Sequence, residues 1–191
     1  MMSTNHRSLL IAAAAVAAVQ SAALGWMIAG RVSLLKSGRE MTVEVVPVDP
    51  RDIFRGEYVI LGYTFSGTGD TPLPAGTRVG DAVYADLKQG EGTKWDLVSV
   101  SSKHPDKVEP GHAVLKGIAS YIWTSSEQGA IKGRIQYGIE NYFVPEGEGH
   151  GLEEKVRDKK IDAILAVSAS GEAAIKAIAV DGQRVHEEAL F

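Results

Sequence analysis

The sequence contains no cysteine, and this absence removes a whole group of sites from consideration. Without thiols the chain can form no disulfide, no cysteine-ligated zinc site and no thiolate nucleophile. It also lacks the G-x-S-x-G nucleophile turn, the Walker phosphate loop and a dinucleotide-binding glycine fingerprint between a strand and a helix. The sequence therefore gives no basis for a serine-hydrolase or nucleotide-binding site of these types.

An excess of positive charge is also missing. Lys and Arg total 20 against 24 Asp and Glu, which gives a formal net charge of −4 over 191 residues. Proteins that bind nucleic acid usually carry a basic field that attracts the phosphate backbone. We therefore expect no nucleic-acid partner.

One long hydrophobic run is present, from residue 9 to residue 29, and it contains no formal charge. Its 21 residues would form a helix about 30 Å long, which matches the hydrocarbon core of a bilayer. We predict a transmembrane signal-anchor helix over 9–29 that contacts membrane lipid, after a short tail (1–8) and before a juxtamembrane linker (30–40). Gln20 and Ser21 lie in the middle of this run, where they could contact a helix of a membrane-protein partner.

Two other interpretations of this run remain open. A signal peptide could be cleaved near Ser21, Ala22 and Ala23, although the apolar run continues past them to Ile28. A buried helix of a soluble protein is less consistent with the sequence, because apolar residues occupy nearly the whole circumference. The uncleaved anchor is the favoured interpretation.

The flanking charges do not decide the orientation of the anchor. Arg7 precedes the run and Arg31, Lys36 and Arg39 follow it, so charge alone would keep the C-terminal side in the cytoplasm. Large domains can cross despite such charges, and a short N-terminal tail before one anchor is a common arrangement. We expect a single-pass protein of the cell inner membrane with its C-terminal domain in the periplasm.

Beyond residue 40 the hydrophobic pattern changes to short alternating or apolar stretches separated by Gly, Pro, Asp and Ser. This pattern predicts a mainly β domain over 41–182, an antiparallel sandwich or barrel, followed by a C-terminal tail over 183–191. The alanine-rich last stretch could instead be helical, and 152–158 is predicted to be a short helix. The predicted strands begin near residue 41 and continue at 57–65, 81–87, 95–100, 113–123, 134–144, 161–167 and 173–180.

Two polar clusters are candidates for a functional surface. The first cluster, residues 49–63, concentrates charge before an apolar strand. Its two arginines could bind a carboxylate or phosphate. A hydrogen-bonded structural turn is the simpler interpretation of the same residues. The candidate residues of this cluster are Asp49, Arg51, Asp52, Arg55, Gly56, Glu57, Tyr58, Leu61 and Tyr63.

The second cluster, residues 137–154, combines acidic, aromatic and glycine residues. If residues 146–150 were extended, Glu146, Glu148 and His150 would lie on one side and could hold a divalent ion. The alternating glycines oppose a regular strand and the spacing matches no specific motif, so we expect no metal and no cofactor. The candidate residues of this cluster are Tyr137, Glu140, Tyr142, Glu146 and Glu148.

The two clusters together resemble the signatures of the GDYXXLXY family of bacterial membrane-anchored proteins. Gly56, Tyr58, Leu61 and Tyr63 match the pattern that names the family, with Glu57 in place of its Asp, and the second cluster is similar to its second signature. The resemblance covers most of the chain from the anchor to about residue 182. It implies a membrane-anchored envelope domain and supplies no catalytic residues.

Three functional hypotheses follow. The first is a non-enzymatic binding or scaffolding module for a membrane or periplasmic partner. The second is a membrane-tethered hydrolase that uses Glu140, Glu146 or Glu148 as acid and base, with or without a metal ion. In the third, both clusters are structural, and Arg51 and Arg55 lie opposite Glu140 and Glu146. The distance between the two clusters separates these hypotheses.

Overall fold

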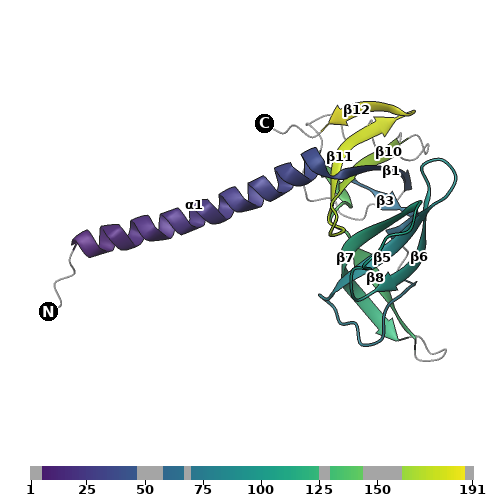
Figure 1. The fold of residues 1–191 in the computed structure, drawn as a ribbon, viewed down its shortest axis with the longest axis horizontal. Helices are drawn as coiled ribbons and strands as arrows, with labels where there is room; N and C mark the ends of the chain where they lie inside the picture. The colour runs from purple at the N-terminus through teal and green to yellow at the C-terminus, as the bar shows by residue number, and fades with distance from the viewer. Residues whose placement is uncertain (1–5, 47–57, 67–69, 125–129, 144–160, 188–191) are drawn as a thin grey trace.

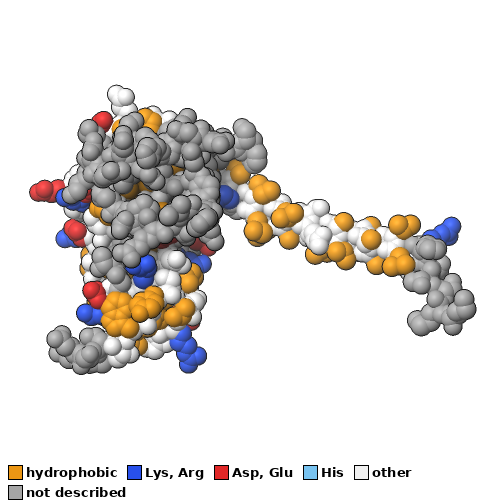
Figure 2. Space-filling model, turned by 180° about the vertical axis from the view of Figure 1, so that it is seen from behind, with side chains coloured by type: hydrophobic (Ala, Val, Ile, Leu, Met, Phe, Trp, Pro, Cys, Tyr) orange, Lys and Arg blue, Asp and Glu red, His pale blue; other side chains and the backbone are white. Residues whose placement is uncertain are grey.

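The computed structural model describes residues 6–46, 58–66, 70–124, 130–143 and 161–187, and it places one long helix beside a body of β-strands (Figure 1). The helix, α1 (His6–Ser37), projects from the body, and apolar side chains cover it on the visible face (Figure 2). The apolar stretch of this helix is not buried against the body. In the described part of the chain, α1 is the one helix with the length and composition to cross a membrane. The expected long apolar helix is therefore present.

The helix ends at Ser37, before Gly38. Residues 30–37, expected to belong to a linker, continue the helix as far as the body. A side chain at Gly38 would place its Cβ 2.5 Å from the carbonyl oxygen of Leu34 and 3.0 Å from the side chain of Ala166. Only glycine fits there, because the chain turns out of the helix directly against a strand.

The last turn of α1 packs onto the body. Leu35 is 3% exposed and forms a small cluster with Ala166 and Ala174, and Leu34 packs against the same cluster. The two alanines lie on adjacent strands of the first sheet, and their small side chains allow the helix to approach closely. The helix is thus joined to the body through a packed contact.

The first sheet contains the predicted hairpin of residues 161–167 and 173–180, which is confirmed. Its strand order is β12-β11-β10-β1-β3, and all of its pairs are antiparallel. The alanine-rich segment is a strand rather than a helix, because it pairs on both sides and buries Ile175 and Ile178 in the core. The strands are β1 (Arg39–Val46), β3 (Gly62–Tyr63), β10 (Ile161–Val167), β11 (Ala173–Val180) and β12 (Gln183–Glu187).

The second sheet has the order β4-β8-β7-β5-β6 and is also antiparallel. Three of its strands coincide closely with the predicted segments that begin at residues 81, 95 and 113. The shortest strand, β4, has no clear signal in the sequence. The strands are β4 (Thr71–Pro72), β5 (Ala82–Gln89), β6 (Trp95–Ser101), β7 (His112–Thr124) and β8 (Ile131–Gln136).

Two predicted strands were wrong as single elements. The segment 57–65 is divided into β2 (Tyr58–Ile60), β3 and a 3₁₀ turn, η1 (Thr64–Ser66), and β2 pairs with β9 rather than with β1. The segment 134–144 is divided into β8 and β9 (Asn141–Phe143), because Gly138 adopts a φ of 76° and turns the chain. Apolar periodicity alone cannot show where a strand leaves one sheet for another.

The core lies between the two five-stranded sheets. Alternate residues of β1, β5, β7 and β10 face it, among them Val45, Leu87, Leu115 and Leu165, which are fully buried. This period of two is the pattern that predicted a half-buried antiparallel sheet, and the mainly β fold is confirmed. The body also reaches beyond residue 182, because β12 occupies part of the segment expected to be a tail. The predicted helix at 152–158 lies outside the described residues.

Glu40 on β1 joins three strands of the first sheet at its surface. Lys176 Nζ donates to Oε1 at 2.8 Å and Arg184 Nη2 donates to Oε2 at 2.5 Å. The hydrogen bond from Lys176, aided by the charges of both cations, holds the pKa of Glu40 below its ordinary value of 4.5. A carboxylate with a lowered folded-state pKa stabilises the fold above its unfolded pKa and loses that effect as the pH falls through the folded value.

We therefore expect Glu40→Gln to be less stable than the wild type at neutral pH. The difference in free energy of unfolding should be constant above about pH 4.5 and should shrink as the pH falls further. Urea unfolding at several pH values measures it. Glu91→Gln, which removes a carboxylate from an exposed turn, is the control. A Glu40→Gln difference that grows toward low pH would contradict this assignment.

Candidate functional site

The described parts of the two polar clusters lie side by side. β2 and β9 form an antiparallel ladder in which Tyr58 is opposite Phe143 and Val59 is opposite Tyr142. The ladder continues where the Leu61 amide donates to the carbonyl oxygen of Glu140 at 2.8 Å. Segments about eighty residues apart in the sequence are thus held together by backbone hydrogen bonds.

Leu61, Tyr63 and Tyr137 are buried beneath this ladder. The Tyr63 hydroxyl donates to the carbonyl oxygen of Ile139 at 2.7 Å. The Tyr63 ring stacks on Phe65 with centroids 5.2 Å apart, and Phe65 meets the Tyr137 ring edge-on at 5.5 Å. Burial, and to a lesser extent the charge of Glu140, raises the pKa of both tyrosines well above its ordinary value, so both remain neutral.

Glu140 closes the turn between β8 and β9. Its Oε1 accepts a hydrogen bond from the Tyr137 amide at 2.6 Å, three residues earlier, in the manner of a polar side chain that caps a turn. Gly138 supplies the positive φ that this turn requires. In the described structure Glu140 therefore has a structural partner, and no arrangement seen there favours it as the acid or base of a hydrolase.

Tyr63 and Tyr137 provide a matched pair of hydroxyl deletions. Tyr63→Phe should lower the free energy of unfolding by about 1–3 kcal/mol, because it leaves the buried carbonyl of Ile139 without its donor. The buried Tyr137 hydroxyl has no hydrogen-bond partner in the described part of the chain. Tyr137→Phe should therefore be neutral or stabilising. Denaturant unfolding of the two variants tests this, and equal losses would contradict it.

The remaining candidate residues of both clusters lie outside the described residues, and so do their proposed ion pairs and the divalent-ion hypothesis for His150. Their roles stay predictions. Within the described ranges, no three His, Asp or Glu side chains come together in a way that could hold a metal ion. The residues concerned are Asp49, Arg51, Asp52, Arg55, Gly56, Glu57, Glu146 and Glu148.

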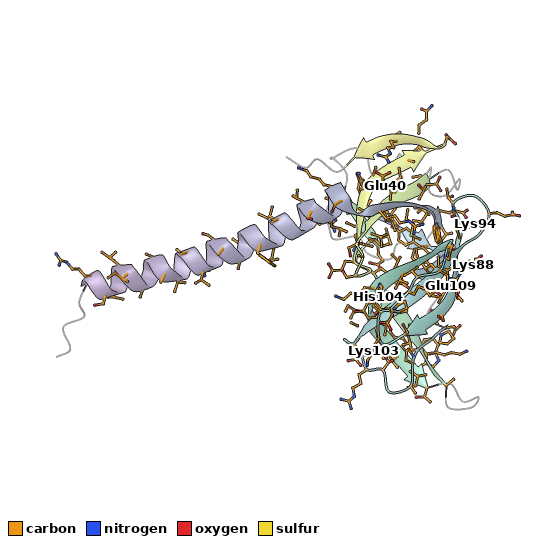
Figure 3. The ribbon with its side chains drawn as sticks, viewed as in Figure 1. Glu40, Lys88, Lys94, Lys103, His104 and Glu109 are labelled. Atoms are coloured by element: carbon orange, nitrogen blue, oxygen red, sulfur yellow. The ribbon has the colours of Figure 1, made fainter. Side chains whose placement is uncertain are left out.

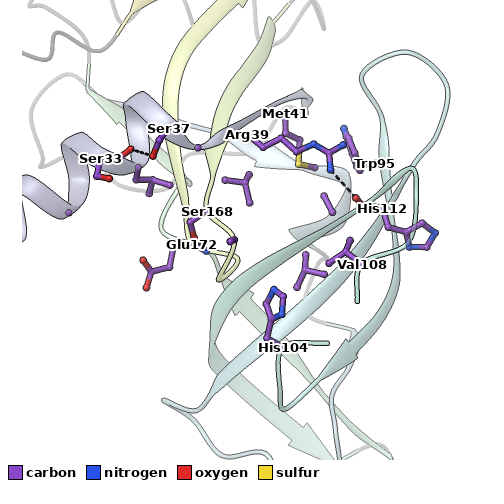
Figure 4. Close-up of a pocket in the computed structure, with 17 residues that line it drawn as sticks. Ser33, Ser37, Arg39, Met41, Trp95, His104, Val108, His112, Ser168 and Glu172 are labelled. Atoms are coloured by element: carbon purple, nitrogen blue, oxygen red, sulfur yellow. Dashed lines mark hydrogen bonds between the residues drawn. The ribbon is translucent and has the colours of Figure 1, made fainter. Parts of the chain in front are cut away.

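A groove of about 630 Å³ lies where α1 meets the body (Figure 4). The last turns of α1 form one wall, the β10–β11 turn forms another, and the start of β7 with the loop before it forms the third. Met41, Trp95 and Val108 contribute apolar surface, whereas Ser33 and Glu172 contribute polar surface. Arg39 Nη1 donates to the carbonyl oxygen of His112 at 3.5 Å, linking β1 to β7.

The polar groups of this groove have partners that shape the fold. Figure 4 shows the His112 ring turned away from the groove, where its Nδ1 lies 2.9 Å from Asp86 Oδ1. Ser168 Oγ accepts a hydrogen bond from the Glu172 amide at 3.0 Å and closes the β10–β11 turn. The groove is thus lined by both apolar and polar side chains, and among its described lining residues no nucleophile is aligned with a base.

A second groove, of about 780 Å³, adjoins the first and reaches the preceding turn of α1. Trp26 and Met27 of the helix face Lys116, Ile118 and Gln136 of β7 and β8 across it. Sequence patterns did not predict either groove, because each is built from segments far apart in the chain. The only feature of the sequence that drew attention to this region was the presence of Trp26 and three basic residues at the end of the apolar run.

Comparison with known proteins gives one result. No curated protein and no solved structure matches the chain, but the family model described as GDYXXLXY protein matches residues 20–178. The match covers most of the chain and includes both polar clusters, the second half of α1 and the strands that pack beneath it. The chain therefore belongs to the GDYXXLXY family.

Proposed function

We propose that this protein is a membrane-anchored binding or scaffolding module. α1 crosses the cell inner membrane once, the body lies in the periplasm, and the grooves at the end of α1 receive a membrane or periplasmic partner. The β2–β9 ladder, formed by the two family signatures, supports the core from which these surfaces are built.

The observation that carries this proposal is the position of the grooves. The second groove is lined by α1 residues from Trp26 to Leu34, across the end of the apolar run, and the first by α1 residues from Gly30 to Ser37, just beyond it. A binding surface at that level is open both to proteins embedded in the bilayer and to proteins beside it. The groove lining combines apolar side chains with a few polar ones, as binding sites commonly do.

Purification of the full chain from native membranes in mild detergent tests the proposal. We expect a partner to co-purify with the wild type and to be lost from Val108→Glu, which puts a charge into the first groove. Val98→Glu makes the same change at an exposed position of β6 that lines neither groove. A chain that emerges alone, or equal retention by both variants, would contradict the proposal.

The orientation has a separate test. Protease added to intact cells with a permeabilised outer membrane should digest the body if it is periplasmic. The same digestion of inverted inner-membrane vesicles should leave it protected. The reverse result would place the body in the cytoplasm, as the basic residues after the span would favour on their own.

A further inference from the structure

We propose that the outer face of β7 and β8 rests on the bilayer surface and binds the head groups of anionic phospholipids. This inference rests on the membrane anchoring proposed above. It assigns a lipid contact to the second sheet, in addition to the lipid contact of α1.

The geometry begins with the second groove. Trp26 and Met27 belong to the last turns of the predicted span, and they line this groove together with Lys116 and Ile118 of β7. Tryptophan at the end of a span lies at the level of the lipid head groups. The strand that faces it across the groove is therefore at the head-group level as well.

The outer face of β7 and β8 has side chains suited to that level. Tyr121 is 61% exposed and Ile118 is 42% exposed, and the Tyr121 ring lies 5.6 Å from the ring of Trp123. Across the ladder, Tyr121 is opposite Arg134 and Trp123 is opposite Lys132. Residues directly opposite each other share a face of the sheet, so aromatic rings and cations alternate there. Aromatic rings with neighbouring Lys and Arg are typical of membrane interfaces.

The Lys and Arg residues of β7 and β8 have no acidic residue beside them on these two strands. Neither β7 nor β8 contains an acidic residue, and α1 contains none either. The acidic group that borders the groove, Glu172, lies 3.3 Å from Lys116 and offsets one cation. Lys132 and Arg134 add further positive charge on β8. Anionic head groups complement this arrangement.

Figure 2 shows hydrophobic side chains gathered on the lower part of the body with Lys and Arg side chains beside them. In Figure 3, Lys103 and His104 lie on the side of the second sheet nearer to α1, whereas Lys88 and Lys94 lie on the opposite side. Lys88 is opposite His112 and so shares a face of the sheet with Lys116, but in this view it lies with Lys94 on the side away from α1, and these two positions provide the control.

The absence of native cysteine allows a single-cysteine experiment on the full chain. A fluorophore is attached to Gln136→Cys on the outer face of β8, or to Val98→Cys on β6 as the control. The protein is reconstituted into vesicles of phosphatidylcholine, with or without phosphatidylglycerol, that carry a quencher on some head groups. We expect quenching at residue 136 to increase when phosphatidylglycerol is present, and quenching at residue 98 to stay low.

Charge removal tests which cations contribute. Lys132→Gln with Arg134→Gln should reduce the ratio of docked to undocked protein about five-fold for each cation, because a basic residue near an anionic surface contributes ~1 kcal/mol. Lys88→Gln with Lys94→Gln removes the same charge at the two positions that lie away from α1 in Figure 3 and should change nothing. Added salt should weaken the contact in the wild type.

The outcomes separate this inference from the proposed function. If alkaline carbonate extracts the chain from the vesicles, the anchoring itself is wrong. The lipid contact is overturned if the chain is retained but residues 136 and 98 are quenched equally. It is also overturned if quenching at residue 136 does not change with phosphatidylglycerol, or does not change when Lys132 and Arg134 are replaced. Protection of residue 136 in native membranes, without quenching in pure lipid, would also overturn it in favour of a protein on this face.

Discussion

Phe65→Ala is expected to lower the free energy of unfolding of the body by about 3–5 kcal/mol, a large part of the stability of a typical domain. Phe65 is 2% exposed and is among the largest fully buried side chains. It contacts the ring of Tyr63 on one side and that of Tyr137 on the other. Its removal would open a cavity at η1, which follows β3 of the first sheet and precedes β4 of the second. Urea unfolding of the full chain in detergent measures the loss.

Tyr121→Ala is the matched control, because it removes an aromatic ring of similar size from an exposed position. Its effect on the free energy of unfolding should lie within about 0.5 kcal/mol of zero, as for most surface substitutions. A comparable loss for both variants would show that the aromatic cluster of Phe65 does not hold the core together.

The second large effect is expected on membrane insertion, from arginines placed in the middle of α1. Val16→Arg combined with Val19→Arg places two charges near the centre of the predicted span, at a cost of about 2.5–3.5 kcal/mol each for membrane insertion. Both side chains are exposed along the helix, so the body offers them no partner. We expect alkaline carbonate to release the variant from membranes and to leave the wild type in the pellet.

Ser8→Arg combined with Ser33→Arg adds the same charge on either side of the span. Arginines at these positions can reach the head groups, and the variant should stay in the membrane pellet. Equal extraction of the two variants would show that the apolar run is not embedded in the bilayer. A processed form that lacks the run would instead support the cleaved signal peptide.

The sequence was sufficient for the fold class because the signals that define it are local. The alternation at Met41, Val43 and Val45 identifies a half-buried strand without knowledge of its partner. The apolar run of α1 is equally local. The breaks in the segments 57–65 and 134–144 were not predictable in this way, since they depend on which distant strand each half joins.

The arrangement of the clusters was predictable only in part. The hypothesis that they bind each other across the fold has support in the backbone pairing of β2 with β9. It assumed ion pairs, whereas the described contact of Glu140 is with the Tyr137 amide. Burial of Tyr63 could not be inferred from residue type, because a tyrosine in a polar motif is equally compatible with an exposed position. The grooves depend on how the end of α1 packs, which no sequence pattern encodes.

The packed junction at Leu35 and Gly38 limits how the body can move. A flexible linker would let the body swivel about its anchor and sample every direction in the plane of the membrane. Here α1 continues directly into β1 and packs against the first sheet at Leu35 and Gly38. A rotation or tilt of α1 would therefore turn the sheets with it. If α1 spans a bilayer as proposed, a partner protein beside the bilayer would have to approach the body from a fixed direction, and movements of neighbouring membrane helices would be transmitted to the sheets.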